Sequence, residues 1–153
     1  MNTSQIKLPP FAAGTIDLAS PRLGAEVIFA TDDFFADKSR LLRVEEPVFI
    51  PEKYDQNGKW MDGWESKRRR VPGNDHCIIR LGTKGIISGI NINTRFFTGN
   101  HPPQGSLEAV FSDNDPDIDT NWTQILPISN LNADADNFFP ISSDLPFNYL
   151  KFN

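Results

Sequence analysis

The sequence predicts an all-β protein, an antiparallel β-sandwich or jelly roll, from three observations. The 12 prolines and 10 glycines are spread along the chain and divide it into short segments with no long helical window. Several of these segments alternate apolar and polar residues with the period of a strand. The 153 residues, of which 39% are hydrophobic, fit one domain, because a single core is typical of roughly 100–150 residues.

Seven segments have strand character, and one short segment is predicted as a helix. The expected strands are rich in β-branched and aromatic residues and are bounded by Pro, Asn, Asp or Gly. The helix is too short to cover a sheet, which favours packing of sheet on sheet. The expected strands are residues 24–29, 48–50, 76–81, 86–92, 106–112, 122–126 and 149–152, and the expected helix is residues 37–42.

The central pair of strands is predicted as a hairpin. Alternation puts Cys77, Ile79 and Leu81 on one face of the first strand. Residues 82–85, with a glycine at each end, are expected to form the turn that pairs this strand with residues 86–92. The predicted core is Cys77, Ile79, Leu81, Ile90, Ile92, Leu107 and Phe111.

Composition excludes several classes of protein. No window approaches the ~18 apolar residues of a membrane span, and the N-terminal segment lacks the layout of a secretory signal, so the cytoplasm is the expected compartment. A single cysteine excludes a disulfide scaffold and a cysteine-rich zinc site. A net charge of -5 disfavours nucleic acid and anionic membranes as partners, while a homo-oligomer stays open.

Residues 58–73 combine two tryptophans, two carboxylates and four consecutive basic residues from Lys67 to Arg70, which suggests a binding site. In an extended segment Arg68 and Arg70 point the same way, and each guanidinium can pair bidentately with a carboxylate. Trp60 and Trp64 are expected to line such a pocket; the alternative is that they are core residues without a role in binding. The alternative is a solvated edge strand whose charges prevent aggregation.

A second polar cluster spans residues 94–103 and contains His101, one of only two histidines. Because imidazole titrates near neutrality, His101 is a candidate proton carrier; the alternative is a solvated loop histidine. A phosphate-binding glycine loop, a serine nucleophile elbow and a His-x-x-x-His pair are all absent from the sequence.

Alternating aspartates occur twice. Asp113, Asp115, Asp117 and Asp119 resemble the start of a calcium loop, but Ile118 stands where an EF-hand needs glycine. A turn between strands is the better interpretation there and at residues 132–137, and a looser calcium site is the alternative.

Several segments together resemble the allantoicase family. The matching blocks are residues 17–20, 23–24, 29–36, 58–66, 68–73, 77–82, 97–100 and 102–103, and the resemblance runs from about residue 17 to the C-terminus. It implies a galactose-binding-like jelly roll in residues 17–153, after a tail of residues 1–16. It also implies hydrolysis of allantoate, at an amidine-type C–N bond, to ureidoglycolate and urea in purine degradation.

Allantoate carries one carboxylate and two ureido groups on one carbon, so its site needs a cation, amide-like partners and a proton carrier. From the matching blocks we expect Arg68 and Arg70 to bind the carboxylate, with Lys59 also binding substrate. The remaining expected roles are ureido binding by Thr98 and Asn100, and proton transfer by Glu65, Asp75 or His101. No cofactor is expected. A divalent metal remains an open alternative, although no ligand spacing in the sequence indicates one.

The sequence departs from the family pattern at two positions and in its extent. His76 stands where an aromatic residue is expected, and Asn93 where an aspartate is expected. The family chain usually holds two repeats, and this sequence is expected to correspond to the first, without its last strand. The alternative functions are a non-catalytic ligand-binding module and an inactive, truncated paralogue; truncation would favour self-association and low activity.

Overall fold

Strands dominate the computed structural model, which describes residues 9–10, 14–34, 37–42, 50–56, 58–59, 63–64, 66, 74–99 and 101–153. In chain order the elements are η2 (Pro21–Leu23), β1 (Glu26–Ala30), η3 (Lys38–Leu42), β2 (Tyr54–Asp55), β3 (Gly58–Lys59), β4 (Cys77–Ile86), β5 (Gly89–Asn93), β6 (Gln104–Val110), β7 (Thr123–Asn130), β8 (Asp136–Pro140) and β9 (Pro146–Phe152). The all-β prediction is confirmed. In the described part of the chain, no helix has the length and apolar character needed to cross a membrane.

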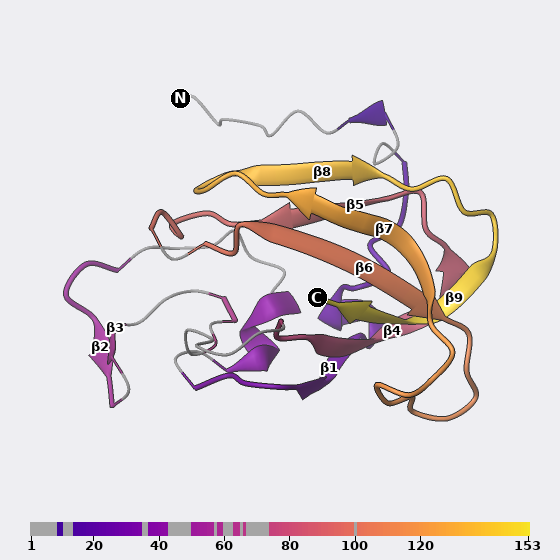
Figure 1. The fold of residues 1–153 in the computed structure, drawn as a ribbon, viewed down its shortest axis with the longest axis horizontal. Coiled ribbons are helices and arrows are strands. Elements are labelled where there is room, and N and C mark those ends of the chain that lie inside the picture. Colours follow the sequence, from indigo (N-terminus) through magenta and orange to yellow (C-terminus); the bar gives the residue numbers. More distant parts are fainter. Residues whose placement is uncertain are drawn as a thin grey trace.

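The strands form an antiparallel sandwich of unequal layers (Figure 1). The larger layer is a five-stranded sheet in the order β1-β4-β9-β6-β7, and β5 pairs with β8 in the other layer. A short pair, β2 and β3, stands apart. β9 is hydrogen-bonded to β4 on one side and β6 on the other, so the last strand before Asn153 lies inside the sheet. That a further strand follows in the complete domain stays a prediction.

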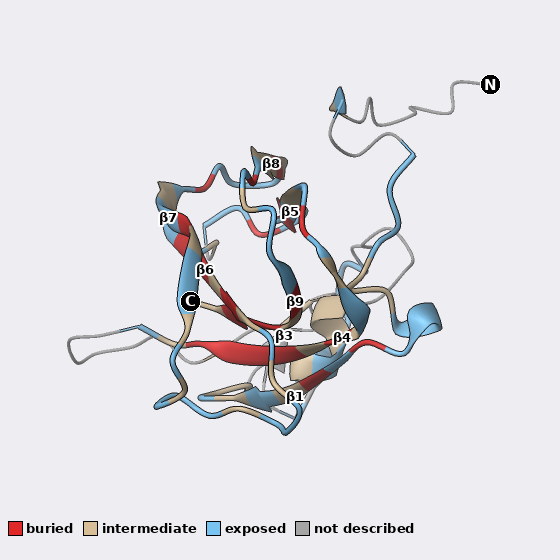
Figure 2. Ribbon diagram, turned by 90° about the vertical axis from the view of Figure 1, so that its right-hand side faces the viewer, coloured by how far each residue is buried: buried red, intermediate tan, exposed pale blue. Residues whose placement is uncertain are grey.

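The core lies between the two layers, on the faces of β4, β6 and β9 that look toward β5 and β8 (Figure 2). Five of the seven predicted core residues are buried there: Cys77, Ile79, Leu81, Ile92 and Leu107. The sixth, Ile90, is partly buried and packs against this cluster. The seventh is wrong, because β6 ends at Val110 and leaves Phe111 half exposed beneath the ammonium group of Lys84.

The predicted hairpin at residues 82–85 is also wrong. β4 continues through both glycines to Ile86, and β5 pairs with β8 instead of β4. The glycines are needed for close packing: a Cβ on Gly82 would lie 2.6 Å from Cγ of Leu23, and one on Gly85 would lie 2.9 Å from Cδ1 of Leu18. The N-terminal segment therefore crosses the strand where side chains are missing.

The remaining local predictions have mixed outcomes. The short helix is present as η3, and Asp37 precedes it and accepts a hydrogen bond from the backbone N–H of Ser39. Hydrogen bonds from Ser39 also lower the pKa of the Asp37 carboxyl. β8 was missed, because the polar residues 132–137 look like a turn and the strand begins inside them. The expected strand at residues 48–50 lies mostly outside the described residues, and Ile50 itself is not in a strand.

Candidate active site at one end of the sandwich

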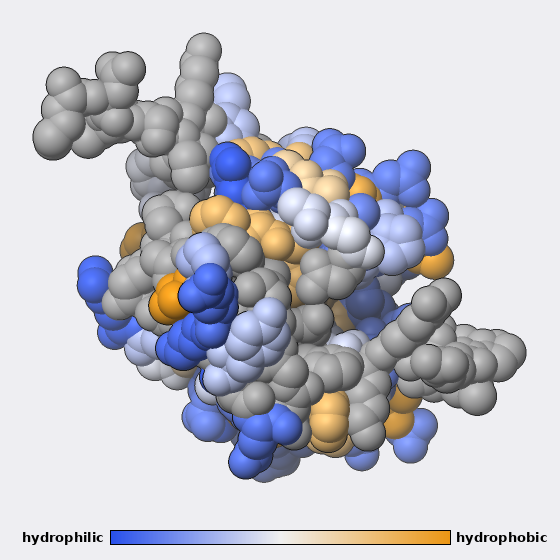
Figure 3. Space-filling model, turned by 90° about the vertical axis from the view of Figure 1, so that its left-hand side faces the viewer, coloured by the Kyte–Doolittle hydropathy of each residue, from blue (hydrophilic) through white to orange (hydrophobic). Residues whose placement is uncertain are grey.

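The topology brings described parts of three of the segments that resemble the family, residues 29–34, 63–64 and 97–99, to one end of the sandwich. Antiparallel pairing collects the ends of β1, β5, β7 and β9 with the starts of β4, β6 and β8, for example through the pairs Ala30↔Cys77, Cys77↔Phe152 and Asn93↔Asp136. We call this the site end; it lies to the left in Figure 1 and faces the viewer in Figure 3. Its described surface carries both hydrophilic and hydrophobic groups (Figure 3).

Asp75, one of the three predicted proton carriers, is held at the start of β4. The hydroxyl of Thr31 donates to Oδ1 of Asp75 over 2.9 Å. The same hydroxyl accepts the backbone N–H of His76 at 3.0 Å, and the N–H of Thr31 donates to the carbonyl of His76 at 3.0 Å. The half-buried carboxylate therefore has one oxygen fixed by a residue 44 positions earlier in the chain.

Trp64 connects the segment that follows β1 to the loop that follows β5. Its indole Nε1–H donates to the carbonyl of Asp32 at 2.7 Å, and its ring lies edge-on to Phe152 with centroids 6.4 Å apart. A Cβ on the adjacent Gly63 would lie 3.2 Å from the ring of Phe97, so this contact leaves little room for a side chain. The segments around Asp32, Trp64 and Phe97 thus form one packed unit.

Thr98 and His101 lie together in the loop between β5 and β6. Thr98 is exposed, and Nδ1 of the half-buried His101 lies 3.1 Å from the carbonyl oxygen of Thr98. A carbonyl only accepts, so Nδ1 carries the hydrogen in this contact, and the contact does not use Nε2.

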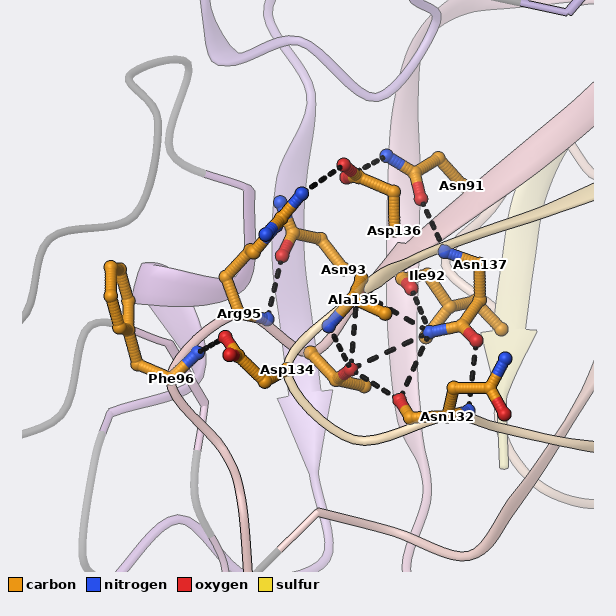
Figure 4. A network of polar contacts seen from close by, with 11 residues as sticks. Asn91, Ile92, Asn93, Arg95, Phe96, Asn132, Asp134, Ala135, Asp136 and Asn137 are labelled. Atoms are coloured by element: carbon orange, nitrogen blue, oxygen red, sulfur yellow. Dashed lines mark hydrogen bonds and ion pairs between the residues drawn. The ribbon is translucent and has the colours of Figure 1, made fainter. Parts of the chain in front are cut away.

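The base of this loop is held by a polar network built around the buried side chains of Thr94 and Asn137 (Figure 4). The amide of Asn137 donates to the carbonyl of Ile92 at 2.9 Å and accepts the N–H of Asn132 at 2.9 Å. The hydroxyl of Thr94 donates to the carbonyl of Asn132 at 2.6 Å. Farther along, the N–H of Phe96 donates to Asp134 at 2.8 Å, and the N–H of Asp134 to the carbonyl of Phe97 at 3.1 Å.

Two titratable groups beside Asp75 are kept neutral by burial. His76 is 6% exposed, and burial, with the nearby charge of Lys151, lowers the pKa of its imidazole. Its ring lies 5.7 Å from that of Phe29, and its buried Nε2 has no hydrogen-bond partner. Burial raises the pKa of the Cys77 thiol to about 12, so Cys77 is a core residue and not a nucleophile.

The predicted site residues have different outcomes. Asp75, Thr98 and His101 are at the site end, in two groups that Trp64 and its neighbours connect. The backbone of Lys59 belongs to β3. Among the residues that the structure describes, no three acidic, histidine or cysteine side chains are arranged to hold a metal ion. Four predicted residues lie outside the described ranges: Glu65, Arg68, Arg70 and Asn100.

Two residues of the site end were missed by the sequence analysis. Thr31 contacts Asp75 through its side chain, and Asp32 accepts the Trp64 indole N–H through its backbone carbonyl. Both lie in the family-like block of residues 29–36, directly after β1. A polar pair directly after a predicted strand was the available signal, but nothing local indicates that the partner of Thr31 is Asp75.

Comparison with known proteins agrees with this geometry. The family model of the allantoicase repeat matches residues 16–153. The chain belongs to the allantoicase family. A protein of Photobacterium profundum named "Probable allantoicase" is 49% identical over 139 residues, covering 90% of this chain and 42% of that protein. Another, from Ralstonia nicotianae, is 44% identical over 154 residues, covering 100% of this chain and 46% of its own length. The chain therefore spans less than half the length of these relatives.

Solved structures give the same result for the fold. The allantoicase of Saccharomyces cerevisiae superposes with a TM-score of 0.77 at 26% identity, covering 90% of this chain and 43% of that one. A CBM32 domain from a Clostridium perfringens glycoside hydrolase superposes with a TM-score of 0.55 at 18% identity, covering 84% of this chain and 76% of that one, and this likeness concerns the fold alone. The predicted galactose-binding-like sandwich is thus confirmed.

Proposed function

We propose that this chain contributes an allantoate-hydrolysing site, located at the site end of the sandwich. The observation that carries the proposal is the meeting, at this end, of three of the matching blocks, which are residues 29–36, 58–66 and 97–100. Thr31 contacts Asp75, Trp64 contacts Asp32, and Gly63 lies against Phe97, next to Thr98. Family membership supplies the substrate class, since the relatives are named allantoicases. The products would be ureidoglycolate and urea.

In the proposed reaction, some of the expected residues bind allantoate and others transfer protons. Arg68 and Arg70 bind the carboxylate of allantoate, as bidentate guanidinium–carboxylate pairing favours, with Lys59 as a further cation. Thr98 and Asn100 bind the ureido groups. A carboxylate, Asp75 or Glu65, removes a proton from the attacking water, and His101, in the form that carries a hydrogen on Nε2 as well as on Nδ1, protonates the departing urea nitrogen. Both steps require that the carriers hold defined positions relative to the substrate carbon.

The test uses a chimera. In the Photobacterium profundum relative, the aligned 139 residues are replaced by those of this chain, and urea release from allantoate is measured for the chimera, the intact relative and the 153-residue chain. Urea release by the chimera near the rate of the intact relative supports the proposal. A chimera that is folded by circular dichroism and releases no urea overturns it. Activity of the short chain alone would contradict the expectation that truncation lowers activity.

The same samples distinguish the alternative functions. A non-catalytic binding module would bind allantoate, or a sugar in a glycan screen, without releasing urea, and an inactive paralogue would do neither. The cytoplasm stays the proposed compartment, because the chain's one cysteine, Cys77, is a free buried thiol, as is usual where thiols stay reduced.

A further inference from the structure

Thr31 bonds both to the backbone of His76 and to the side chain of Asp75. It follows β1 directly, and its N–H extends the β1–β4 ladder by donating to the carbonyl of His76. Its hydroxyl then accepts the N–H of His76 at 3.0 Å, which leaves one hydroxyl hydrogen to be given away. Two acceptors are in range, Oδ1 of Asp75 at 2.9 Å and the carbonyl of His76 at 3.3 Å.

The carboxylate is the better acceptor of that hydrogen. It is closer by 0.4 Å, the difference between 3.3 and 2.9 Å, and a bond to an ionised oxygen is stronger than one to a neutral carbonyl. Because the hydroxyl oxygen already accepts the His76 N–H, fewer directions remain for its hydrogen. Thr31 itself cannot shift easily, since the indole of Trp64 holds the carbonyl of the next residue, Asp32.

We propose that Thr31 is a positioning residue, which holds the Asp75 carboxylate in one orientation for proton transfer to or from the substrate. This rests on the proposed function and adds to it, because Thr31 touches Asp75 and not the reacting atoms. Pre-orientation lowers the cost of reaching the reactive geometry.

The first experiment measures orientation without using activity. Three-bond couplings of isotopically labelled 153-residue chain report the χ1 rotamer of Asp75 in the wild type, in Thr31→Val and in Thr31→Ser. Valine keeps the shape of threonine and loses the hydroxyl, whereas serine keeps the hydroxyl. We expect one rotamer in the wild type and in Thr31→Ser, and a different rotamer or an average over several in Thr31→Val. The wild-type Asp75 rotamer, retained unchanged in Thr31→Val, overturns the proposal.

The second experiment measures catalysis in the chimera. Thr31→Val is expected to lower kcat about tenfold to a hundredfold with little change in KM, and Thr31→Ser to restore most of kcat. In a chimera that already carries Asp75→Asn, Thr31→Val is expected to have no further effect. The matched control is Thr120→Val, which removes a hydroxyl bonded to Asp117 in the loop between β6 and β7.

The outcomes separate this inference from the proposed function. A wild-type chimera without urea release overturns the function, while the rotamers of Asp75 still decide whether Thr31 orients it. An active chimera whose kcat is the same with Thr31→Val overturns the positioning role. If Thr31→Val lowers kcat by the same factor in the wild-type and Asp75→Asn backgrounds, the positioning role is also overturned, because Thr31 would then act independently of Asp75.

Discussion

The two ends of the sandwich are stabilised by different kinds of contact. At the site end, loops are held by side chains bonded to distant backbone groups, chiefly those of Thr31, Thr94 and Asn137. At the opposite end, where β4, β6 and β8 finish, apolar side chains are left in contact with solvent: Ile86 is 58% exposed and Leu145 is 56% exposed. Among the described residues, side-chain bonds to distant backbone groups are therefore more numerous at the site end; at the opposite end Asn148 makes two such bonds to Ser112.

Backbone conformation differs in the same way. Phe96 has a φ of 68° and Asp134 a φ of 47°, in the left-handed region that costs residues other than glycine about 1–3 kcal/mol. Their mutual bonding, from the N–H of Phe96 to the Asp134 carboxylate, offsets part of that cost. Strain of this kind persists only where surrounding contacts determine the conformation, and here it lies at the base of the loop that carries Thr98.

The largest contrast between the ends is expected in activity. Asp75→Asn removes a candidate proton carrier and is expected to lower urea release by the chimera about 10²–10⁴-fold. Asp144→Asn makes the same chemical change at an exposed position of the opposite end and is expected to leave the rate unchanged. The rates are compared at saturating allantoate. Equal rates for the two variants would remove Asp75 from the mechanism.

The second contrast concerns stability and compares two asparagines. Asn137→Ala leaves buried backbone groups without partners and is expected to lower the free energy of unfolding by roughly 2–4 kcal/mol. Asn148, at the opposite end, is half-buried and bonds the N–H and carbonyl of Ser112 at 2.9 and 2.7 Å. Asn148→Ala is expected to cost about 1 kcal/mol. Urea denaturation measures both, and a larger loss for Asn148→Ala would reverse the comparison.

A smaller effect is expected from pH, through His76. Its pKa is lowered in the fold from the ordinary value of 6.5 by burial and by Lys151, while Asp75 and Glu108 oppose the shift. As pH falls through 6.5, the unfolded chain binds a proton that the folded chain does not, so stability decreases. His76→Phe introduces an aromatic residue, as the family resemblance implies at this position, and removes the imidazole that binds this proton in the unfolded chain.

The measurement is the difference in unfolding free energy between wild type and His76→Phe at pH 8 and at pH 5. Other carboxylates titrate in both proteins, so the difference isolates His76. The wild type is expected to lose more stability than the variant on going to pH 5. Parallel pH profiles would mean that the buried imidazole is not linked to folding.

How far the sequence predicts this molecule depends on the distance over which each residue acts. The core positions Cys77, Ile79 and Leu81 were predictable, because period-2 alternation is a local signal. The continuation of β4 through Gly82 was not, because that glycine accommodates Leu23, which is distant in sequence. The candidate site follows the same rule: Asp75 and Thr98 could be named as candidates from the sequence, but the bond from Thr31 to Asp75 needed the fold.

The smallest effect on stability is expected at the apolar surface of the opposite end. Leu145→Ser replaces an exposed side chain and is expected to change the free energy of unfolding by no more than about 0.5 kcal/mol. Leu131→Ser makes the same change at the site end, where Leu131 is 5% exposed and part of the core, and is expected to cost several kcal/mol, about 3 or more. Denaturation curves give the free energies of unfolding of both variants, and light scattering of the same samples tests association.

If exposed apolar groups drive the self-association expected of this chain, Leu145→Ser scatters less than wild type at equal concentration while unfolding at the same midpoint. Unchanged scattering would mean that this end does not mediate association.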